Sequence, residues 1–155
     1  MGSRGSVIPF FQKIAAQGLP LPLTDRRMTR FWISIEQAVK FVLDSFDLMS
    51  GGELYVPRIP SMKLVDLANA ISPNTKISEI GMRPGEKLHE EMISADDSRR
   101  TLLLHDRYVV MPVVAEWGYV PPKGKSMKEG FAYRSDTNDL WMSQDDISEF
   151  LRRIN

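Results

Sequence analysis

Residues 81–91 read Gly-Met-Arg-Pro-Gly-Glu-Lys-Leu-His-Glu-Glu, and they are the most informative stretch of this 155-residue chain. Pro84 and Gly85 predict a tight turn, and a short helical pattern is expected to begin near Glu86. The guanidinium of Arg83 would then lie beside a helix N-terminus, a place that suits a phosphate or pyrophosphate. Glu86 would accept hydrogen bonds from sugar hydroxyls. The alternative is an ordinary surface turn in which Arg83 and Glu86 pair with each other.

Composition limits the classes of partner that the chain can have. Hydrophobic residues make up 43% of the sequence, which is enough for a core, and the 20 basic side chains balance the 20 acidic ones. This balance gives no overall field toward nucleic acid or an anionic membrane, so we expect neither as a partner. With no cysteine and only two histidines, we expect no disulfide and no metal site, and we place the protein in the cytoplasm.

Hydrophobic periodicity predicts an α/β chain of helices and short strands. Helices are expected after four serine caps, at Ser6, Ser34, Ser61 and Ser143. Strands are expected over residues 28–33, 53–56, 76–80, 101–104 and 108–111. The second helix carries one clean apolar stripe, from Ile35 to Phe46. Because the strands are short and scattered, we expect the smaller lobe of a larger fold rather than a complete parallel sheet.

Two further corners of the chain could hold an anion. The loop Gly2-Ser3-Arg4-Gly5-Ser6 leads into the first helix, although a disordered terminus or a cloning remnant would look similar. Arg30 lies beside two aromatic residues where a loop enters a strand, and the alternative there is a solvated basic turn. We find no pattern of catalytic residues. Three anion-friendly corners without an acid–base pair indicate a nucleotide-type ligand that is bound rather than transformed.

Taken together, the motifs resemble one family, the inverting UDP-N-acetylglucosamine 4,6-dehydratases of the extended short-chain dehydrogenase/reductases. The matching segments are Gly2–Val7, Thr24-Asp25 with Met28–Trp32, Gly52–Pro57, Ile59–Met62 and Arg83–Glu90. The resemblance implies an NADP-dependent enzyme of bacterial surface-sugar biosynthesis. Its reaction is oxidation at sugar C4, loss of water across C5–C6 and return of hydride to C6 with inversion at C5.

The resemblance also implies roles for particular residues. It places Gly2, Ser3 and Arg4 beside the NADP cofactor, and Val7, Thr24, Arg83 and Glu86 on the substrate. Our reading of the residues adds Arg30 as a diphosphate contact.

The chain departs from the family because it lacks the glycine-rich dinucleotide loop, the Tyr-x-x-x-Lys pair and the elimination acid and base. Tyr119 and Lys123 have the required spacing, but Pro121 and Pro122 forbid the helical turn between them. We therefore expect the C-terminal portion of such a fold, lacking its dinucleotide-binding half, with no catalytic residue of its own. Met1 is then either an internal methionine read as a start or the boundary of a fragment.

The resulting hypothesis is a UDP-sugar-binding part of a dehydratase, catalytically incomplete as written. Residues 1–97 would form a substrate-binding lobe with residual Rossmann elements, and residues 98–155 an extension ending in a helix. The alternatives are a non-catalytic partner or regulator of a full-length dehydratase, and the lobe of a related UDP-sugar epimerase. Without the missing sheet, the first helices would expose apolar faces. We therefore expect a homo-oligomer or association with a separate Rossmann half.

Overall fold

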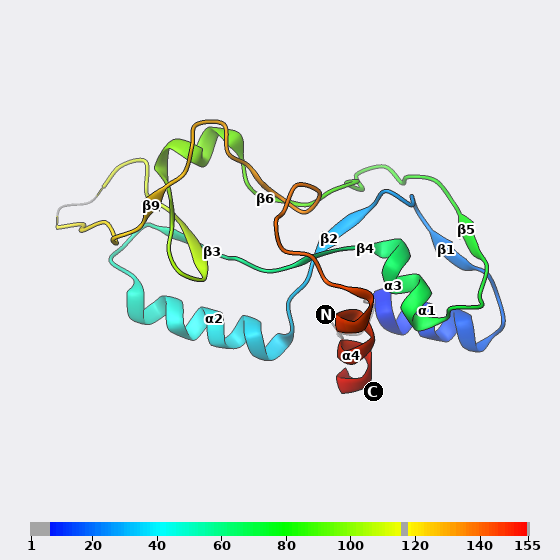
Figure 1. Cartoon of the computed structure of the whole chain (residues 1–155). Coiled ribbons are helices and arrows are strands. Elements are labelled where there is room, and N and C mark those ends of the chain that lie inside the picture. The colour runs from blue at the N-terminus through cyan, green and yellow to red at the C-terminus, as the bar shows by residue number, and fades with distance from the viewer. Residues whose placement is uncertain (1–6, 116–117, 155) are drawn as a thin grey trace. The chain divides into compact units, whose positions relative to one another are not determined.

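A computed structural model describes residues 7–115 and 118–154 of the chain (Figure 1), which form two compact units interleaved along the sequence. The first unit comprises Met1–Trp32, Pro60–Glu90 and Ser135–Asn155, and the second comprises Ile33–Ile59 and Glu91–Arg134. Position 97 lies within a short 3-10 helix of the second unit. A functional division at this position stays a prediction.

The first unit combines three helices with two small sheets. Its elements are α1 (Val7–Ala16), β1 (Leu21–Leu23), β2 (Thr29–Phe31), β4 (Ser61–Lys63), α3 (Leu64–Ile71), β5 (Ile77–Glu79) and α4 (Gln144–Ile154). Strand β1 pairs with β5 in parallel, and β2 pairs with β4 in antiparallel orientation. The core forms where the apolar sides of the three helices meet these strands. Its most deeply buried members include Ile8, Leu21, Leu67 and Ile147.

The start of α3 differs from the sequence prediction. Ser61 does not cap this helix, because it lies in β4, fully buried, and its hydroxyl accepts a hydrogen bond from Asn138 at 3.0 Å. The helix begins at Leu64, and Lys63 occupies the cap position without a side-chain hydrogen bond. The hydroxyl predicted to cap the helix is thus engaged in a contact with a residue 77 positions away in the sequence.

The second unit is built on an antiparallel sheet. Its elements are α2 (Ile35–Leu48), β3 (Leu54–Pro57), β6 (Glu91–Ile93), η1 (Ala95–Arg100), β7 (Thr101–Leu103), β8 (Arg107–Val110), β9 (Lys125–Ser126) and β10 (Tyr133–Arg134). Four strands form one sheet in the order β3-β8-β7-β9, and β6 pairs with β10. The predicted strands at 53–56, 101–104 and 108–111 are confirmed. Residues 119–123 form no helix, as the two prolines predicted.

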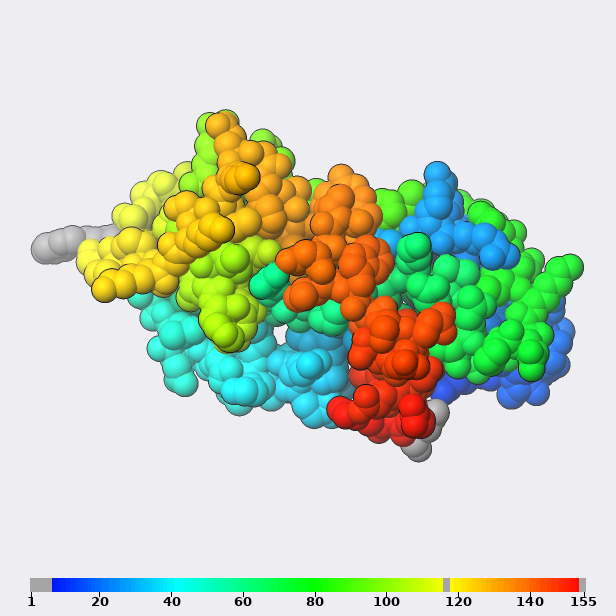
Figure 2. Space-filling view, in the orientation of Figure 1, coloured from blue at the N-terminus to red at the C-terminus, as the bar shows by residue number. Residues whose placement is uncertain are grey.

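Helix α2 begins as the sequence predicted. The Ser34 side chain accepts a hydrogen bond from the Gln37 backbone N–H, and the Gln37 side chain accepts one from the Ser34 N–H. Its apolar stripe is exposed, as expected for the first helices. For α1 that expectation was wrong, because Ile8 and Phe11 are buried in the core of the first unit against α3 and α4. Figure 2 shows α2, in cyan, at the surface of the second unit.

Helix α4 is also capped as predicted, with Ser143 and Asp146 forming a reciprocal pair of hydrogen bonds. Ile147 and Leu151 point into the core. The predicted cap of α1, Ser6, lies outside the described residues. Within the described part of the chain, no helix has the length and apolar character needed to cross a membrane.

Candidate functional site

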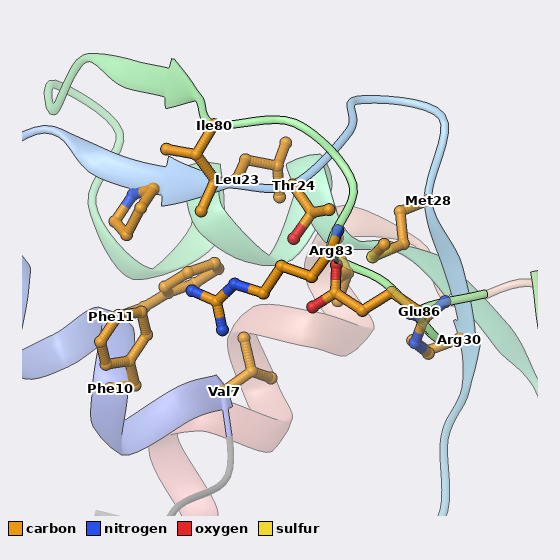
Figure 3. A pocket seen from close by; sticks show the side chains of 12 residues that line it. Val7, Phe10, Phe11, Leu23, Thr24, Met28, Arg30, Ile80, Arg83 and Glu86 are labelled. Carbon is orange, nitrogen blue, oxygen red and sulfur yellow. Dashed lines mark hydrogen bonds between the residues drawn. The ribbon is translucent and has the colours of Figure 1, made fainter. Parts of the chain in front are cut away.

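A pocket of about 430 Å³ opens in the first unit between α1, the end of β1, β2 and the loop that follows β5. Figure 3 shows the residues that line it. They are Val7, Phe10, Phe11, Pro22, Leu23, Thr24, Met28, Arg30, Leu64, Ile80, Arg83 and Glu86. All five residues predicted to contact substrate, which are Val7, Thr24, Arg30, Arg83 and Glu86, are among them. The fold therefore brings together three parts of the chain that lie far apart in the sequence, around residues 7, 24–30 and 83–86.

The turn that carries Arg83 has the geometry of a type II β-turn. Pro84 occupies its second position, and Gly85, at φ +83°, occupies the third, where a positive φ is required. The Glu86 backbone N–H donates to the Arg83 carbonyl at 3.1 Å. The Glu86 carboxylate accepts the Arg83 backbone N–H, also at 3.1 Å. The predicted tight turn is confirmed, and two hydrogen bonds close it.

The helix expected to begin near Glu86 is absent from the described residues, so that prediction was wrong. Residues 87 and 88 instead run beside β2, where the Thr29 backbone N–H donates to the Leu88 carbonyl at 3.1 Å. The Arg30 guanidinium also donates to the carbonyls of Lys87 and Leu88. These carbonyls would serve as acceptors inside a helix, and here β2 occupies them. A helix dipole therefore plays no part in the preference of this corner for an anion.

The side chains of Arg30 and Arg83 are placed very differently. Besides the two carbonyls, the Arg30 guanidinium contacts the Thr29 carbonyl at 2.6 Å and the Glu90 carboxylate at 3.2 Å. Most of its donors are thus occupied by the protein itself. The Arg83 side chain extends across the pocket toward α1 (Figure 3), and no ion pair of its guanidinium occurs among the described residues. Arg83 is consequently the cation that is available to a ligand.

A buried hydrogen-bond network that sequence reasoning missed supports the segment after the turn. The Thr29 hydroxyl lies 2.8 Å from Nδ1 of His89 and 2.7 Å from the Ser135 hydroxyl. Ser135 also accepts the Glu90 backbone N–H at 2.8 Å. The Asp136 carboxylate lies 3.9 Å from Nε2 of His89. The sequence signal for this network is limited to the position of His89, which follows the turn closely. Ser135 is too distant in the sequence for a local pattern to indicate it.

The loop between β1 and β2 is held by one bidentate pair. Asp25 accepts hydrogen bonds from Nε and Nη2 of Arg27, at 3.0 and 2.7 Å, and from the Arg27 backbone N–H at 2.8 Å. The hydrogen bond from the Arg27 side chain is the main reason that the pKa of Asp25 falls to about 2, and the backbone N–H adds to this effect. Thr24 precedes this clamp, so its position at the pocket wall is set by a rigid turn.

The described residues that line this pocket are of types suited to ligand recognition. One wall is apolar and includes Phe10, Phe11 and Leu23, while Arg83 and Thr24 supply polar groups. Glu86 is the single carboxylate among the described lining residues, so the pocket holds no carboxylate pair. No cluster of described side chains is suited to a metal ion. The predicted NADP contacts Gly2, Ser3 and Arg4 lie outside the described residues.

Comparison with known proteins gives the family. The model of a family described as "Polysaccharide biosynthesis protein" matches residues 1–112. The chain belongs to this polysaccharide biosynthesis protein family. As the motifs predicted, this member of the family is similar to a UDP-N-acetylglucosamine 4,6-dehydratase (inverting), that of Campylobacter jejuni subsp. jejuni serotype O:2. The two are 48% identical over 97% of this chain and 48% of the relative.

Two further similarities bear on this member of the polysaccharide biosynthesis protein family. It is 31% identical to a UDP-glucose 4-epimerase of Rickettsia canadensis, over 100% of this chain and 44% of the relative. The X-ray structure of Pen from Bacillus thuringiensis matches all of the chain and 48% of that protein, with a TM-score of 0.85 and 31% identity. The predicted α/β fold class is confirmed. The chain spans about half the length of the curated relatives it matches.

Proposed function

We propose that the pocket of the first unit binds the UDP portion of a UDP-sugar, as the substrate-side part of an inverting UDP-N-acetylglucosamine 4,6-dehydratase. The observation that carries this proposal is the position of Arg83. A closed turn presents its guanidinium in a pocket that also contains Val7, Thr24 and Glu86. The names of the relatives support the proposal, because both the dehydratase and the epimerase act on a UDP-sugar.

The shape and polarity of the pocket fit such a ligand. A planar base can lie against an apolar wall that includes Phe10 and Phe11, and a planar guanidinium can contact two phosphate oxygens at once. The Glu86 carboxylate accepts one backbone hydrogen bond and has further lone pairs for a sugar hydroxyl. Because Arg30 is already engaged by the main chain, its contribution is to hold the segment behind the turn rather than to form the principal phosphate contact.

The remainder of the activity belongs to the complete enzyme. NADP would supply hydride removal and return, and its predicted contacts here are Gly2, Ser3 and Arg4. We propose no catalytic residue within this chain. Lyase activity would require the other half of the enzyme, which corresponds to the part of the relatives that this chain does not cover. A cytoplasmic location, and either a homo-oligomer or association with a separate Rossmann half, are part of the same proposal. The alternatives are a regulator of a full-length dehydratase and the lobe of a UDP-sugar epimerase.

Isothermal titration calorimetry of the 155-residue chain with UDP tests the proposal. We expect saturable binding at or below about millimolar ligand. Arg83→Ala should weaken UDP binding about 10- to 100-fold, because one charge-assisted contact is lost. The UDP affinity of Arg83→Lys should lie between those of the parent chain and Arg83→Ala, because lysine keeps the positive charge but lacks the two-pronged guanidinium. Uridine, which has no phosphate, should bind the parent chain and Arg83→Ala with similar affinity.

The matched control is Arg26→Ala, which removes one positive charge from the same unit without altering the pocket lining. UDP affinity should remain within about twofold of the parent protein in this variant. A folded chain that shows no heat of binding at millimolar UDP contradicts the proposal. Equal weakening by Arg26→Ala and Arg83→Ala would show a general charge effect instead. Tighter binding of UDP-glucose than of UDP-N-acetylglucosamine would favour the epimerase alternative.

A further inference from the structure

His89 links two of the segments that form the pocket of the first unit. Its Nδ1 atom lies 2.8 Å from the hydroxyl of Thr29 in β2. The residues on either side of Thr29, Met28 and Arg30, line the pocket, whereas His89 belongs to the segment that follows the Arg83 turn. Thr29 is buried, and the His89 side chain is 22% exposed. The imidazole is therefore placed to hold the turn segment against the β2 wall of the pocket.

The hydrogens around a neutral His89 can be counted, because each hydroxyl has only one to donate. Ser135 accepts the Glu90 backbone N–H at 2.8 Å, and its own hydrogen has two acceptors within reach, the Thr29 hydroxyl at 2.7 Å and the Thr29 carbonyl at 3.3 Å. When His89 carries its hydrogen on Nε2, Thr29 donates to Nδ1 and Ser135 donates to the Thr29 hydroxyl. The Asp136 carboxylate, 3.9 Å from Nε2, favours this tautomer, because the other one would turn a lone pair toward a negative charge.

The same arrangement of atoms also accommodates a protonated His89. Nδ1 then donates to the Thr29 hydroxyl, Thr29 donates to the Ser135 hydroxyl, and Ser135 donates to the Thr29 carbonyl. Protonation thus reverses the direction of the hydrogen bonds without moving any atom other than hydrogen. An extra hydrogen in a buried network is costly when it leaves a donor unpaired, and in this chain of hydroxyls it does not.

The charged groups around His89 include more carboxylates than cations. They are Asp25 and Arg27 of the β1–β2 loop, Arg30 of β2, Glu90 of the turn segment and Asp136. The pKa of Asp25 is lowered mainly by the Arg27 side chain and, to a smaller extent, by the charge of His89. A positive charge on His89 therefore interacts favourably with these groups, most directly with the Asp136 carboxylate at 3.9 Å.

We infer that His89 is a positioning residue of the pocket, and that its protonation tightens the binding of an anionic UDP-sugar. The inference rests on the proposed function. Protonation adds the interaction with Asp136, which holds the segment after the Arg83 turn more firmly, and it places a positive charge behind the β2 wall of the pocket. Both effects favour a ligand with a negatively charged diphosphate. Affinity should therefore rise as the pH falls through the range in which histidines titrate, from about 8 to about 5.

Calorimetric titration of the 155-residue chain with UDP-N-acetylglucosamine at about pH 8 and about pH 5.5 tests the inference. The diphosphate of this ligand is esterified at both ends, so it lacks the terminal phosphate group of UDP that titrates near pH 6. We expect the affinity to be about two- to fivefold higher at the lower pH, which is the effect of one partly exposed ion pair. His89→Gln keeps a donor and an acceptor but gains no charge, and should bind equally at both pH values.

The matched control is His105→Gln, which removes the exposed histidine of the second unit and should leave the pH dependence unchanged. NMR of the imidazole ¹⁵N nuclei, assigned with the same variant, supplies a readout that requires no substitution at His89. At about pH 8 the hydrogen of His89 should be on Nε2. A hydrogen on Nδ1 would overturn the inference, because the hydroxyls would then already point away from the imidazole.

The outcomes separate this inference from the proposed function. Binding that is equally tight at both pH values, or a pH dependence that persists in His89→Gln, overturns the role of His89 and leaves the proposed site intact. Absence of binding at both pH values contradicts the proposed function, and the inference with it.

Discussion

The Arg83 guanidinium is available to a ligand because Glu86 forms its hydrogen bonds with the Arg83 backbone and not with the Arg83 side chain. The carboxylate of Glu86 accepts the backbone N–H, and the Arg83 carbonyl accepts the N–H of Glu86. The simple alternative for this motif, a surface pair between the two side chains, would have consumed the positive charge. The turn therefore positions the arginine and leaves its fork free at the same time.

Gly85 tests whether the shape of the turn matters for binding. Its φ of +83° costs an alanine roughly 1–2 kcal/mol, and no neighbouring atom lies close enough to add a clash. Gly85→Ala should therefore lower stability in urea and also weaken UDP binding. Gly18→Ala is the control, because Gly18 also has a positive φ and open surroundings but lies away from the pocket. Unchanged UDP affinity in Gly85→Ala would show that the turn does not orient Arg83.

Asp25 predicts a pH dependence with a definite sign. Its pKa is about 2 in the folded chain, below the ordinary value of 3.8, mainly because of the Arg27 side chain. The folded state therefore gains stability from this carboxylate above about pH 4, and loses it as the pH falls toward 2. Asp25→Asn should be less stable than the parent at pH 7, and the difference in unfolding free energy should shrink below pH 4.

Carbon-13 NMR titration of the Asp25 carboxyl provides the direct check. Arg27→Gln removes the partner and should return the pKa of Asp25 toward its ordinary value. A carboxyl in the parent chain that titrates near 3.8 would contradict the clamp seen between β1 and β2.

At the scale of elements, local signals predicted most helices and strands. Ser34 and Ser143 both start helices because each forms its cap with a side chain three residues later, an interaction contained within the predicted helix. Ser61 carried the same signal but lies in β4, where it bonds Asn138. The prediction of a short helix after Gly85 was wrong for the same physical reason, because residues of β2 donate hydrogen bonds to the carbonyls of Lys87 and Leu88. Tertiary partners at long sequence separation decided both cases.

The pocket was predictable in part. Arg83, Glu86 and Thr24 stood out as residue types suited to a UDP-sugar, and the motifs that carry them were in the order of one family. The supporting network of Thr29, His89 and Ser135 was not, because its members lie 60 and 106 positions apart. No local pattern marks a hydroxyl that becomes useful only after distant segments meet.

The cap of α4 provides a stability prediction. Ser143→Ala removes the hydroxyl that accepts the Asp146 N–H and should lower the free energy of unfolding by about 1 kcal/mol. The control is Ser148→Ala in the same helix, whose hydroxyl bonds only the Gln144 carbonyl and should cost little. Urea unfolding followed by circular dichroism measures both. Equal losses in the two variants would remove the cap as the explanation.

At the scale of the whole molecule, the chain combines a formed pocket with an uncovered helix. The pocket belongs to the first unit, whose core includes side chains from α1, α3 and α4. The exposed apolar stripe of α2 belongs to the second unit. This contrast fits a chain that spans about half the length of its relatives. It predicts that ligand recognition is retained by the isolated chain while its solution behaviour depends on what covers α2.

The proposed UDP site lies entirely within the first unit. Two-dimensional ¹H–¹⁵N NMR of the labelled chain, titrated with UDP, tests it most directly, because each backbone amide reports separately. We expect saturable shifts at Val7, Thr24, Arg83 and Glu86, and their loss in Arg83→Ala. Shifts confined to the second unit, or a spectrum unchanged at millimolar UDP, would contradict it.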